Sequence, residues 1–173
     1  MRLPVAPPTT CVACGTGHWN DAKPCASALV VSESRLLLVR RARDPWKGMW
    51  DVPGGFCEST EHPVRTAERE VFEETGLQIR VVGFLGIWLD EYPDGHQITK
   101  RTLNIYYHAI PVEPTAPILD ASEVAEIGFF SVADLPDALA FPAHVPAALE
   151  AWKQAVAKGQ LTTPLLDRFP ARD

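Results

Sequence analysis

The sequence has no surplus of positive charge and no long hydrophobic run. Its 173 residues include 16 Lys and Arg against 22 Asp and Glu, which gives a formal net charge of −6. This balance argues against non-specific nucleic-acid binding, which depends on clustered basic side chains. No apolar run reaches the length needed to span a bilayer, and the opening residues MRLPVAPPTT lack the apolar core of a signal peptide. We therefore expect a cytoplasmic protein without a membrane or nucleic-acid partner.

Cysteine is scarce, and in that compartment its four copies are expected to be thiols or metal ligands rather than disulfides. Cys11 and Cys14 form one CxxCG knuckle, whereas a zinc ribbon uses two. His18 and Cys25 are candidates for the missing ligands, but Cys25 falls in a predicted strand. Three interpretations stay open: a degenerate ribbon, a Zn²⁺ site shared between two chains, and an intact site within one chain. Nothing near Cys57 in the sequence marks it as a reactive thiolate.

No internal repeat or low-complexity block occurs, and the length fits one domain. Apolar and alternating runs predict strands, and a helical period predicts an amphipathic helix near the C-terminus. Residues 1–10 and the loop 90–97 are expected to be irregular. The predicted strands are 25–32, 35–41, 77–89 with an interruption at Gly83 or Gly86, 98–110 and the end of 121–131, and the predicted helices are one from Pro63, a short one starting in 133–139 and one over 144–158. These patterns alone indicate an α/β or α+β protein.

Residues 55–77, GFCESTEHPVRTAEREVFEETGL, are the most informative segment. Pro63 suits the first position of a helix, and Gly76 suits the left-handed residue just past its end. On that helix Glu70, Glu73 and Glu74 share one face, at i, i+3 and i+4. Like charges on one face repel, so a cation is expected to compensate them. Ligands that are all oxygen atoms suit Mg²⁺ or Mn²⁺ rather than zinc.

The spacing of this segment resembles the Nudix box, G-x5-E-x7-R-E-U-x-E-E-x-G-U with U aliphatic, and every fixed position from Gly55 to Leu77 is filled. The resemblance covers about residues 24–158 and implies an α/β fold, with a mixed β-sheet sandwiched between α-helices. The expected division is an N-terminal segment with the knuckle (1–23), a Nudix domain (24–160) and a tail (161–173). Some members of the family carry an N-terminal zinc ribbon, and residues 18–24 resemble the segment that follows it.

The resemblance also implies an activity: hydrolysis, dependent on Mg²⁺ or Mn²⁺, of a nucleoside diphosphate linked to another group X. The general base is left open between Glu73 and Glu123, while Glu126 is expected to be structural. Guanidinium geometry suits Arg41 for binding a phosphate. The expected metal ligands are Glu70, Glu73, Glu74 and the Gly55 carbonyl; the expected catalytic residues are Glu73, Glu74, Glu123 and Arg69, with Arg69 orienting the glutamates; Arg41 and Glu61 are expected on the substrate side, where Glu61 braces the loop or the outer shell of the metal.

The group X is less well determined. Pro93, sixteen residues beyond Leu77, resembles a marker of ADP-ribose-cleaving members, whereas Tyr92 resembles one of diadenosine-polyphosphate enzymes. The SQPWPFPxS signature of NADH-cleaving members is absent, and ADP-ribose or a related nucleotide sugar is slightly favoured. A nucleotide-sensing module without catalysis and a sanitiser of oxidised nucleoside triphosphates are the alternatives. One of Trp46 and Trp50 is expected in the core and the other near the pocket, and a homodimer is a further expectation.

Overall fold

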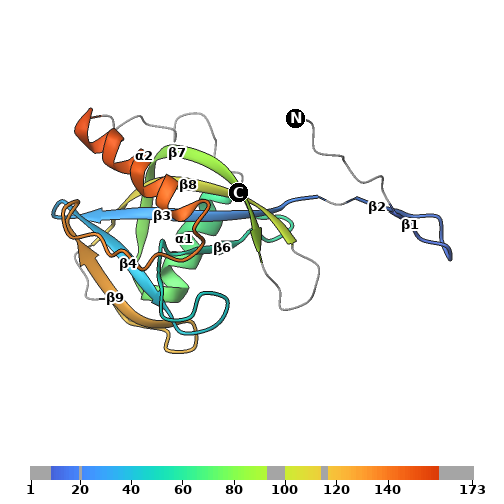
Figure 1. Ribbon diagram of the computed structural model, residues 1–173, viewed down its shortest axis with the longest axis horizontal. Helices are drawn as coiled ribbons and strands as arrows, with labels where there is room; N and C mark the ends of the chain where they lie inside the picture. Colours follow the sequence, from blue (N-terminus) through green and yellow to red (C-terminus); the bar gives the residue numbers. More distant parts are fainter. Residues whose placement is uncertain (1–8, 20, 93–99, 114–116, 160–173) are drawn as a thin grey trace.

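A mixed β-sheet forms the body of the protein (Figure 1). The computed structural model describes residues 9–19, 21–92, 100–113 and 117–159. Its central strand β3 (Lys23–Ser32) pairs in parallel with β8 (Lys100–Pro111) and antiparallel with β4 (Arg35–Arg41) and β6 (Gly54–Phe56). Outer strands extend the sheet on both sides: β7 (Ile79–Tyr92) pairs with β8, and β5 (Trp50–Asp51) and β9 (Val124–Phe130) pair with β4.

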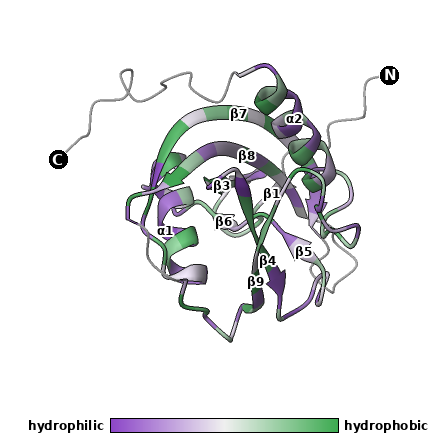
Figure 2. Cartoon of the chain, turned by 90° about the vertical axis from the view of Figure 1, so that its left-hand side faces the viewer, coloured by the Kyte–Doolittle hydropathy of each residue, from purple (hydrophilic) through white to green (hydrophobic). Residues whose placement is uncertain are grey.

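Two helices, α1 (Pro63–Thr75) and α2 (Val145–Ala157), cover opposite sides of this sheet (Figure 2). Alternation along the strands explains the two layers, because successive side chains point to opposite faces. Leu37 packs in the cluster that contains Val71 of α1. Its neighbours Leu36 and Leu38 pack in the cluster that contains Trp152 of α2. The expected mixed sheet between helices is therefore confirmed.

The ends of α1 lie where the sequence predicted them. Pro63 is the first helical residue, and Gly76 follows the last turn with φ of 67°. The Gly76 N–H donates to the Phe72 carbonyl at 2.7 Å, which closes the helix. The register of the glutamates along this helix is consequently the one that the spacing implied.

Two loop predictions were wrong. Strand β7 contains register shifts at both Gly83 and Gly86, but it continues through Tyr92 into the segment expected to be a loop. Residues 133–139 form no helix: Leu139 bridges Trp50, and the Trp50 N–H donates to the Ala138 carbonyl at 2.8 Å. Pro136 disfavours helical geometry at the residue before it, and pairing with β5 keeps the chain extended.

The N-terminal knuckle lies in a separate hairpin, away from the main sheet in Figure 1. Strands β1 (Thr9–Thr10) and β2 (Gly17–His18) pair on either side of Cys11 and Cys14. The expectation that residues 9 and 10 are irregular was therefore wrong. The Cys14 Sγ atom lies 3.2 Å from the Thr16 hydroxyl, and this hydrogen bond lowers the pKa of the thiol. No third Cys, His, Asp or Glu among the described residues completes a metal site with the two thiols.

Some predictions fall on residues 1–8, 93–99 and 161–173, which lie outside the described part; the Pro93 marker and the C-terminal tail are among them. In the part of the chain that the structure describes, no helix combines the length and hydrophobicity needed to cross a membrane.

Candidate active site

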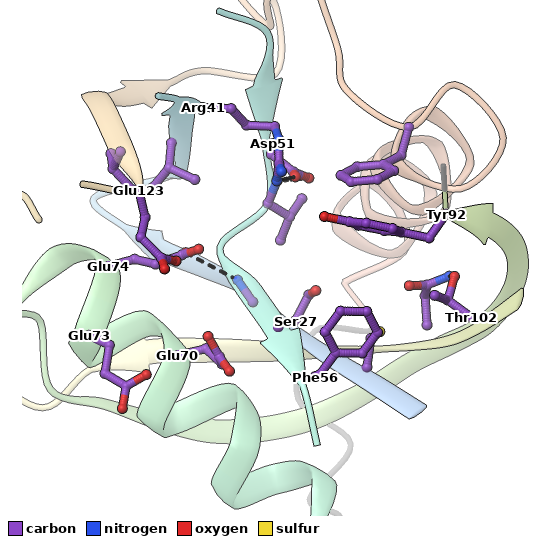
Figure 3. A pocket seen from close by; sticks show the side chains of 18 of the residues that line it. Ser27, Arg41, Asp51, Phe56, Glu70, Glu73, Glu74, Tyr92, Thr102 and Glu123 are labelled. Atoms are coloured by element: carbon purple, nitrogen blue, oxygen red, sulfur yellow. Dashed lines mark hydrogen bonds and ion pairs between the residues drawn. The ribbon is translucent and has the colours of Figure 1, made fainter. Parts of the chain in front are cut away.

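A cavity of about 450 Å³ lies beside α1 and is lined by residues from β3, β4, β6, β8 and the loops before β9 and α2. Its two ends differ in chemistry (Figure 3). The acidic end consists of Asp51, Glu70, Glu73, Glu74 and Glu123, and the aromatic end consists of Phe56, Tyr92 and Phe141. The fold therefore brings the predicted glutamates of α1 together with Glu123, which lies far away in the sequence.

The glycine pair before α1 allows backbone to lie directly against two carboxylates. Gly55 pairs with Ala26 of β3, which holds β6 under the helix. A Cβ atom at Gly55 would collide with the Glu70 carboxylate. The N–H of Gly54 donates to Glu74 Oε2 at 3.2 Å. The backbone of β6 thus lies against both Glu70 and Glu74, and the use of the Gly55 carbonyl as a metal ligand stays a prediction.

Arg69 organises the carboxylates around α1. Its Nη1 donates to Glu70 at 2.7 Å and to Glu73 at 2.9 Å, and its Nε and Nη2 donate to the two oxygens of Glu61 at 3.0 and 2.9 Å. This pairing lowers the pKa of Glu61 to about 2. Neither Arg69 nor Glu61 is among the residues that line the cavity. Glu61 is therefore held by Arg69 rather than exposed to a ligand in the cavity, and the bracing role of Glu61 and the orienting role of Arg69 stay predictions.

Two of the carboxylates that face the cavity, Glu70 and Glu74, have pKa shifts in the opposite direction to that of Glu61. Burial raises the pKa of Glu70, and burial together with the charge of Asp51 raises that of Glu74 well above its usual range. These carboxylates offer negatively charged oxygen atoms in a partly buried place, which suits a hard divalent cation. No three acidic, His or Cys side chains of the described residues already converge on one point. Glu73 turns toward Arg69, so binding would require it to reorient.

The two candidate acidic residues near β9 lie in different places. Glu123 lines the cavity and forms an ion pair with Arg43. Its carbonyl accepts from the Ala42 N–H at 2.9 Å, which ties this loop to the end of β4. Glu126 instead pairs with Arg40 at 3.2 Å, on an exposed surface outside the cavity lining. Of the two, Glu123 therefore lies within reach of a ligand in the cavity, and its role as general base stays a prediction.

Arg41 lines the cavity but already has partners. Its Nε donates to the Pro45 carbonyl at 2.7 Å and its Nη1 to Asp51 at 3.1 Å. Its guanidinium also lies over the Phe141 ring, 5.0 Å from the ring centre. Burial raises the pKa of Asp51 to about 6 although Arg41 opposes this shift. The sequence interpretation missed Asp51, even though its position two residues before the Pro53-Gly54-Gly55 turn was a visible signal.

The aromatic end was also missed, because its members come from separate elements. Phe141 stacks on Tyr92 with 5.7 Å between ring centres, and Phe56 meets Tyr92 edge-on at 5.7 Å. Neither Trp46 nor Trp50 lines the cavity, so the expectation that one of them does was wrong. Both pack against the core beside α2, where apolar contacts compensate for burying large rings.

Comparison with known proteins agrees with this geometry. The family model of the NUDIX domain matches residues 22–150. An ADP-ribose pyrophosphatase of Methanocaldococcus jannaschii is 37% identical over 41% of this chain and 43% of its own length. A NAD-capped RNA hydrolase NudC of Vibrio vulnificus is 29% identical over 73% of this chain and 45% of its own. The chain spans less than half the length of these curated relatives.

Among solved structures, a NUDIX hydrolase from Nitrosomonas europaea superimposes with a TM-score of 0.76. It is 22% identical and the match covers 93% of this chain and 88% of that one, which supports the fold. Because the family model matches most of the chain and the box is complete, the chain belongs to the Nudix family.

Proposed function

We propose that the chain is a pyrophosphohydrolase that cleaves the diphosphate bond of a nucleoside diphosphate linked to another group X. The products would be a nucleoside monophosphate and X-phosphate. The observation that carries the proposal is the two-ended cavity, because carboxylates suit a metal-bridged diphosphate and aromatic rings suit a base. ADP-ribose is the favoured substrate, since the name of one relative refers to its cleavage.

The chemistry requires charge neutralisation and an activated water molecule. A bound Mg²⁺ or Mn²⁺ would supply the neutralisation and orient the water. We assign its ligands to Glu70, Glu73, Glu74 and the Gly55 carbonyl. Arg69 orients these glutamates through the ion pairs described above.

The proton of the attacking water needs an acceptor. Glu123 lines the cavity opposite α1 and is our preferred general base, with Glu73 as the alternative. Arg41 lies where it would bind the substrate through the Phe141 side of the cavity. The oxygen of water adds to phosphorus, the diphosphate oxygen leaves with X-phosphate or the monophosphate, and the base carries the proton away.

The test is phosphate release in a coupled phosphatase assay with Mg²⁺. The panel holds ADP-ribose, NADH, a diadenosine polyphosphate, a nucleotide sugar and oxidised dGTP. Metal-dependent turnover of one member that is lost in Glu74→Gln would support the hydrolase and identify X. Preference for oxidised dGTP would favour the sanitiser. Nucleotide binding without turnover of any member would favour the sensing module.

The N-terminal segment 1–23 is proposed to lie outside the Nudix domain (24–160), with its knuckle not holding zinc within one chain. Two thiols alone are half of a structural zinc site. Purified protein should then contain well under one zinc per chain, measured by metal analysis after dialysis. Stoichiometric zinc that resists dialysis would contradict this. The homodimer and the cytoplasmic location stay predictions.

A further inference from the structure

A polar wall lines the cavity and has no role in the chemistry proposed above. It consists of Thr102, Asn104 and Tyr106, which alternate along β8 and line the cavity together; we call it the β8 wall. Parallel pairing with β3 sets Ser27 beside Tyr106. In Figure 3 Ser27 lies between the glutamates of α1 and the pair Tyr92 and Thr102. The β8 wall therefore faces the middle of a bound ligand, between the part at the acidic end of the cavity and the part at its aromatic end.

The direction of one hydrogen bond decides what Tyr106 offers to that ligand. Its hydroxyl lies 2.6 Å from His144 Nδ1, and both residues are buried. His144 Nε2 lies 3.6 Å from Asp90 Oδ2. A lone pair on Nε2 would be repelled by that carboxylate, so the proton of the neutral ring belongs on Nε2. Nδ1 is then an acceptor, and the Tyr106 O–H must donate to it.

The protonation states support this direction. Burial lowers the pKa of His144 to about 4 against the raising effect of Asp90, so the ring carries one proton at neutral pH. Burial also raises the pKa of Tyr106 well above its usual range, so the phenol keeps its proton. A hydrogen bond from the Ser27 side chain opposes this shift, so one lone pair of the Tyr106 oxygen already has a donor. With the phenol proton directed to His144, what Tyr106 can still present to the cavity is its remaining lone pair, an acceptor.

Asn104 has the same polarity. Its amide nitrogen donates to Thr102 Oγ1 at 2.9 Å and to the Trp88 carbonyl at 3.3 Å. These bonds use both N–H groups of the side chain, and the carbonyl oxygen is its remaining polar atom. Two neighbouring residues of the β8 wall therefore present acceptors rather than donors.

We propose that the β8 wall recognises hydrogen-bond donors on the nucleoside, and that Asp90 and His144 are positioning residues that fix its acceptor polarity. The inference rests on the proposed function in taking the ligand to be a nucleotide. An exocyclic amine of the base and a ribose hydroxyl both offer such donors. The rings of Phe56, Tyr92 and Phe141 provide apolar surface for the base beside the β8 wall.

Calorimetry of nucleotide binding tests this without requiring turnover. The ligands are AMP, purine riboside 5′-monophosphate, which lacks the amine, and 2′-deoxy-AMP, which lacks one hydroxyl. We expect the wild-type protein to bind AMP about tenfold more tightly than the analogue that lacks the recognised donor. Tyr106→Phe should bring that ratio close to one. The matched control Tyr107→Phe should keep it, because Tyr107 packs in the other core cluster, near α1, and does not line the cavity.

Asp90→Asn tests the positioning role with a smaller change. An amide can donate to His144 Nε2, which would allow Nδ1–H to donate to Tyr106 and turn the phenol proton toward the cavity. The tenfold ratio should fall, and Asp90→Glu should restore it. Equal wild-type binding of all three nucleotides, no binding of any of them, or an unchanged ratio in both Tyr106→Phe and Asp90→Asn would overturn the proposal. Loss of turnover with preserved discrimination would contradict the hydrolase alone.

Discussion

Glu61, just before α1, and Glu74, in its last turn, have opposite electrostatic surroundings. Both oxygens of Glu61 accept from Arg69, which lowers the pKa of this carboxyl to about 2. Glu74 faces the cavity, is bound by one backbone N–H and has its pKa raised by burial and by Asp51. Arg69 compensates the charge of Glu61, whereas the printed hydrogen-bond partner of Glu74 is a backbone N–H that carries no formal charge. Uncompensated buried charge of this kind is typical of a site that binds a cation.

The largest effect on this comparison is expected from Glu74→Gln, which should lower kcat by about a thousandfold. The amide can still accept the Gly54 N–H, so the fold should persist. Without metal the melting temperature should rise, because a buried charge is removed, and added Mg²⁺ should stabilise the variant less than the wild type. Kinetics and thermal unfolding with and without Mg²⁺ measure both effects.

Glu68→Gln is the matched control for that experiment. Glu68 lies on the same helix and also accepts a backbone N–H, from Val81 at 3.3 Å, but it does not line the cavity. The same change of charge there should leave kcat near its original value. Equal losses of kcat in the two variants would show that a carboxylate lining the cavity matters no more for turnover than one elsewhere on α1.

Glu123→Gln is expected to lower kcat by about a hundredfold if this carboxylate accepts the proton of water. Glu126→Gln removes an equal charge three residues further on, from an exposed pair with Arg40, and should have little effect. Steady-state kinetics over a range of pH compares them. Near-normal turnover of Glu123→Gln would move the role of general base to Glu73.

Arg69→Ala removes the cation that pairs with Glu61, Glu70 and Glu73. This variant should lower kcat by about ten- to a hundredfold, because the three carboxylates lose their shared donor. Arg65→Ala is its control, since Arg65 pairs only on the exposed surface with Glu68 at 2.8 Å in this part of the helix. Comparison of kcat and of Mg²⁺ affinity distinguishes lost orientation from general destabilisation. Identical kinetics of both variants would argue against the orienting role.

Arg41→Ala should lower the free energy of unfolding by about 3 kcal/mol, because the buried Asp51 carboxyl would lose its cationic partner and would have to take up a proton or stay ionised at a cost. KM should also rise if Arg41 contacts substrate. Arg40→Ala breaks an exposed pair and should cost about 1 kcal/mol or less. Denaturant unfolding and kinetics measure these effects; an unchanged KM would restrict Arg41 to its structural pairing.

The smallest effect is a pH dependence of the metal-free protein. The pKa of Asp51 is about 6 in the folded state, above its ordinary value of 3.8, so the folded state retains the proton to higher pH than the unfolded state does. The contribution of Asp51 to the free energy of unfolding therefore falls as pH rises from about 4 to about 6. Asp51→Asn should flatten this part of the stability profile. A slope identical to that of the wild type would contradict the assignment.

Local rules explain why α1 was predictable and why its surroundings were not. Pro63, Gly76 and the i, i+3, i+4 spacing act within one helix, so its ends and its acidic face follow from neighbouring residues. Asp51 joins the site through pairing of β4 with β5 and through Arg41, and the spacing of the box says nothing about either contact. The prediction of a helix in 133–139 was wrong for the same reason, because Leu139 pairs with Trp50, which lies far away in the sequence.

By itself, the sequence determined the glutamate face and the ends of α1, because helical periodicity and helix caps are encoded over a few residues. The complete box in the sequence pointed to the family, and the resemblance to that family, rather than periodicity, implied the mixed sheet between helices. Tertiary structure decided which carboxylates remain uncompensated, which rings form the aromatic end and which way the Tyr106 hydrogen bond runs. Tyr106 and His144 are 38 residues apart in the sequence. Only strand register and the packing of the loop before α2 bring them within hydrogen-bond distance. Burial there keeps the phenol of Tyr106 protonated and the imidazole of His144 neutral.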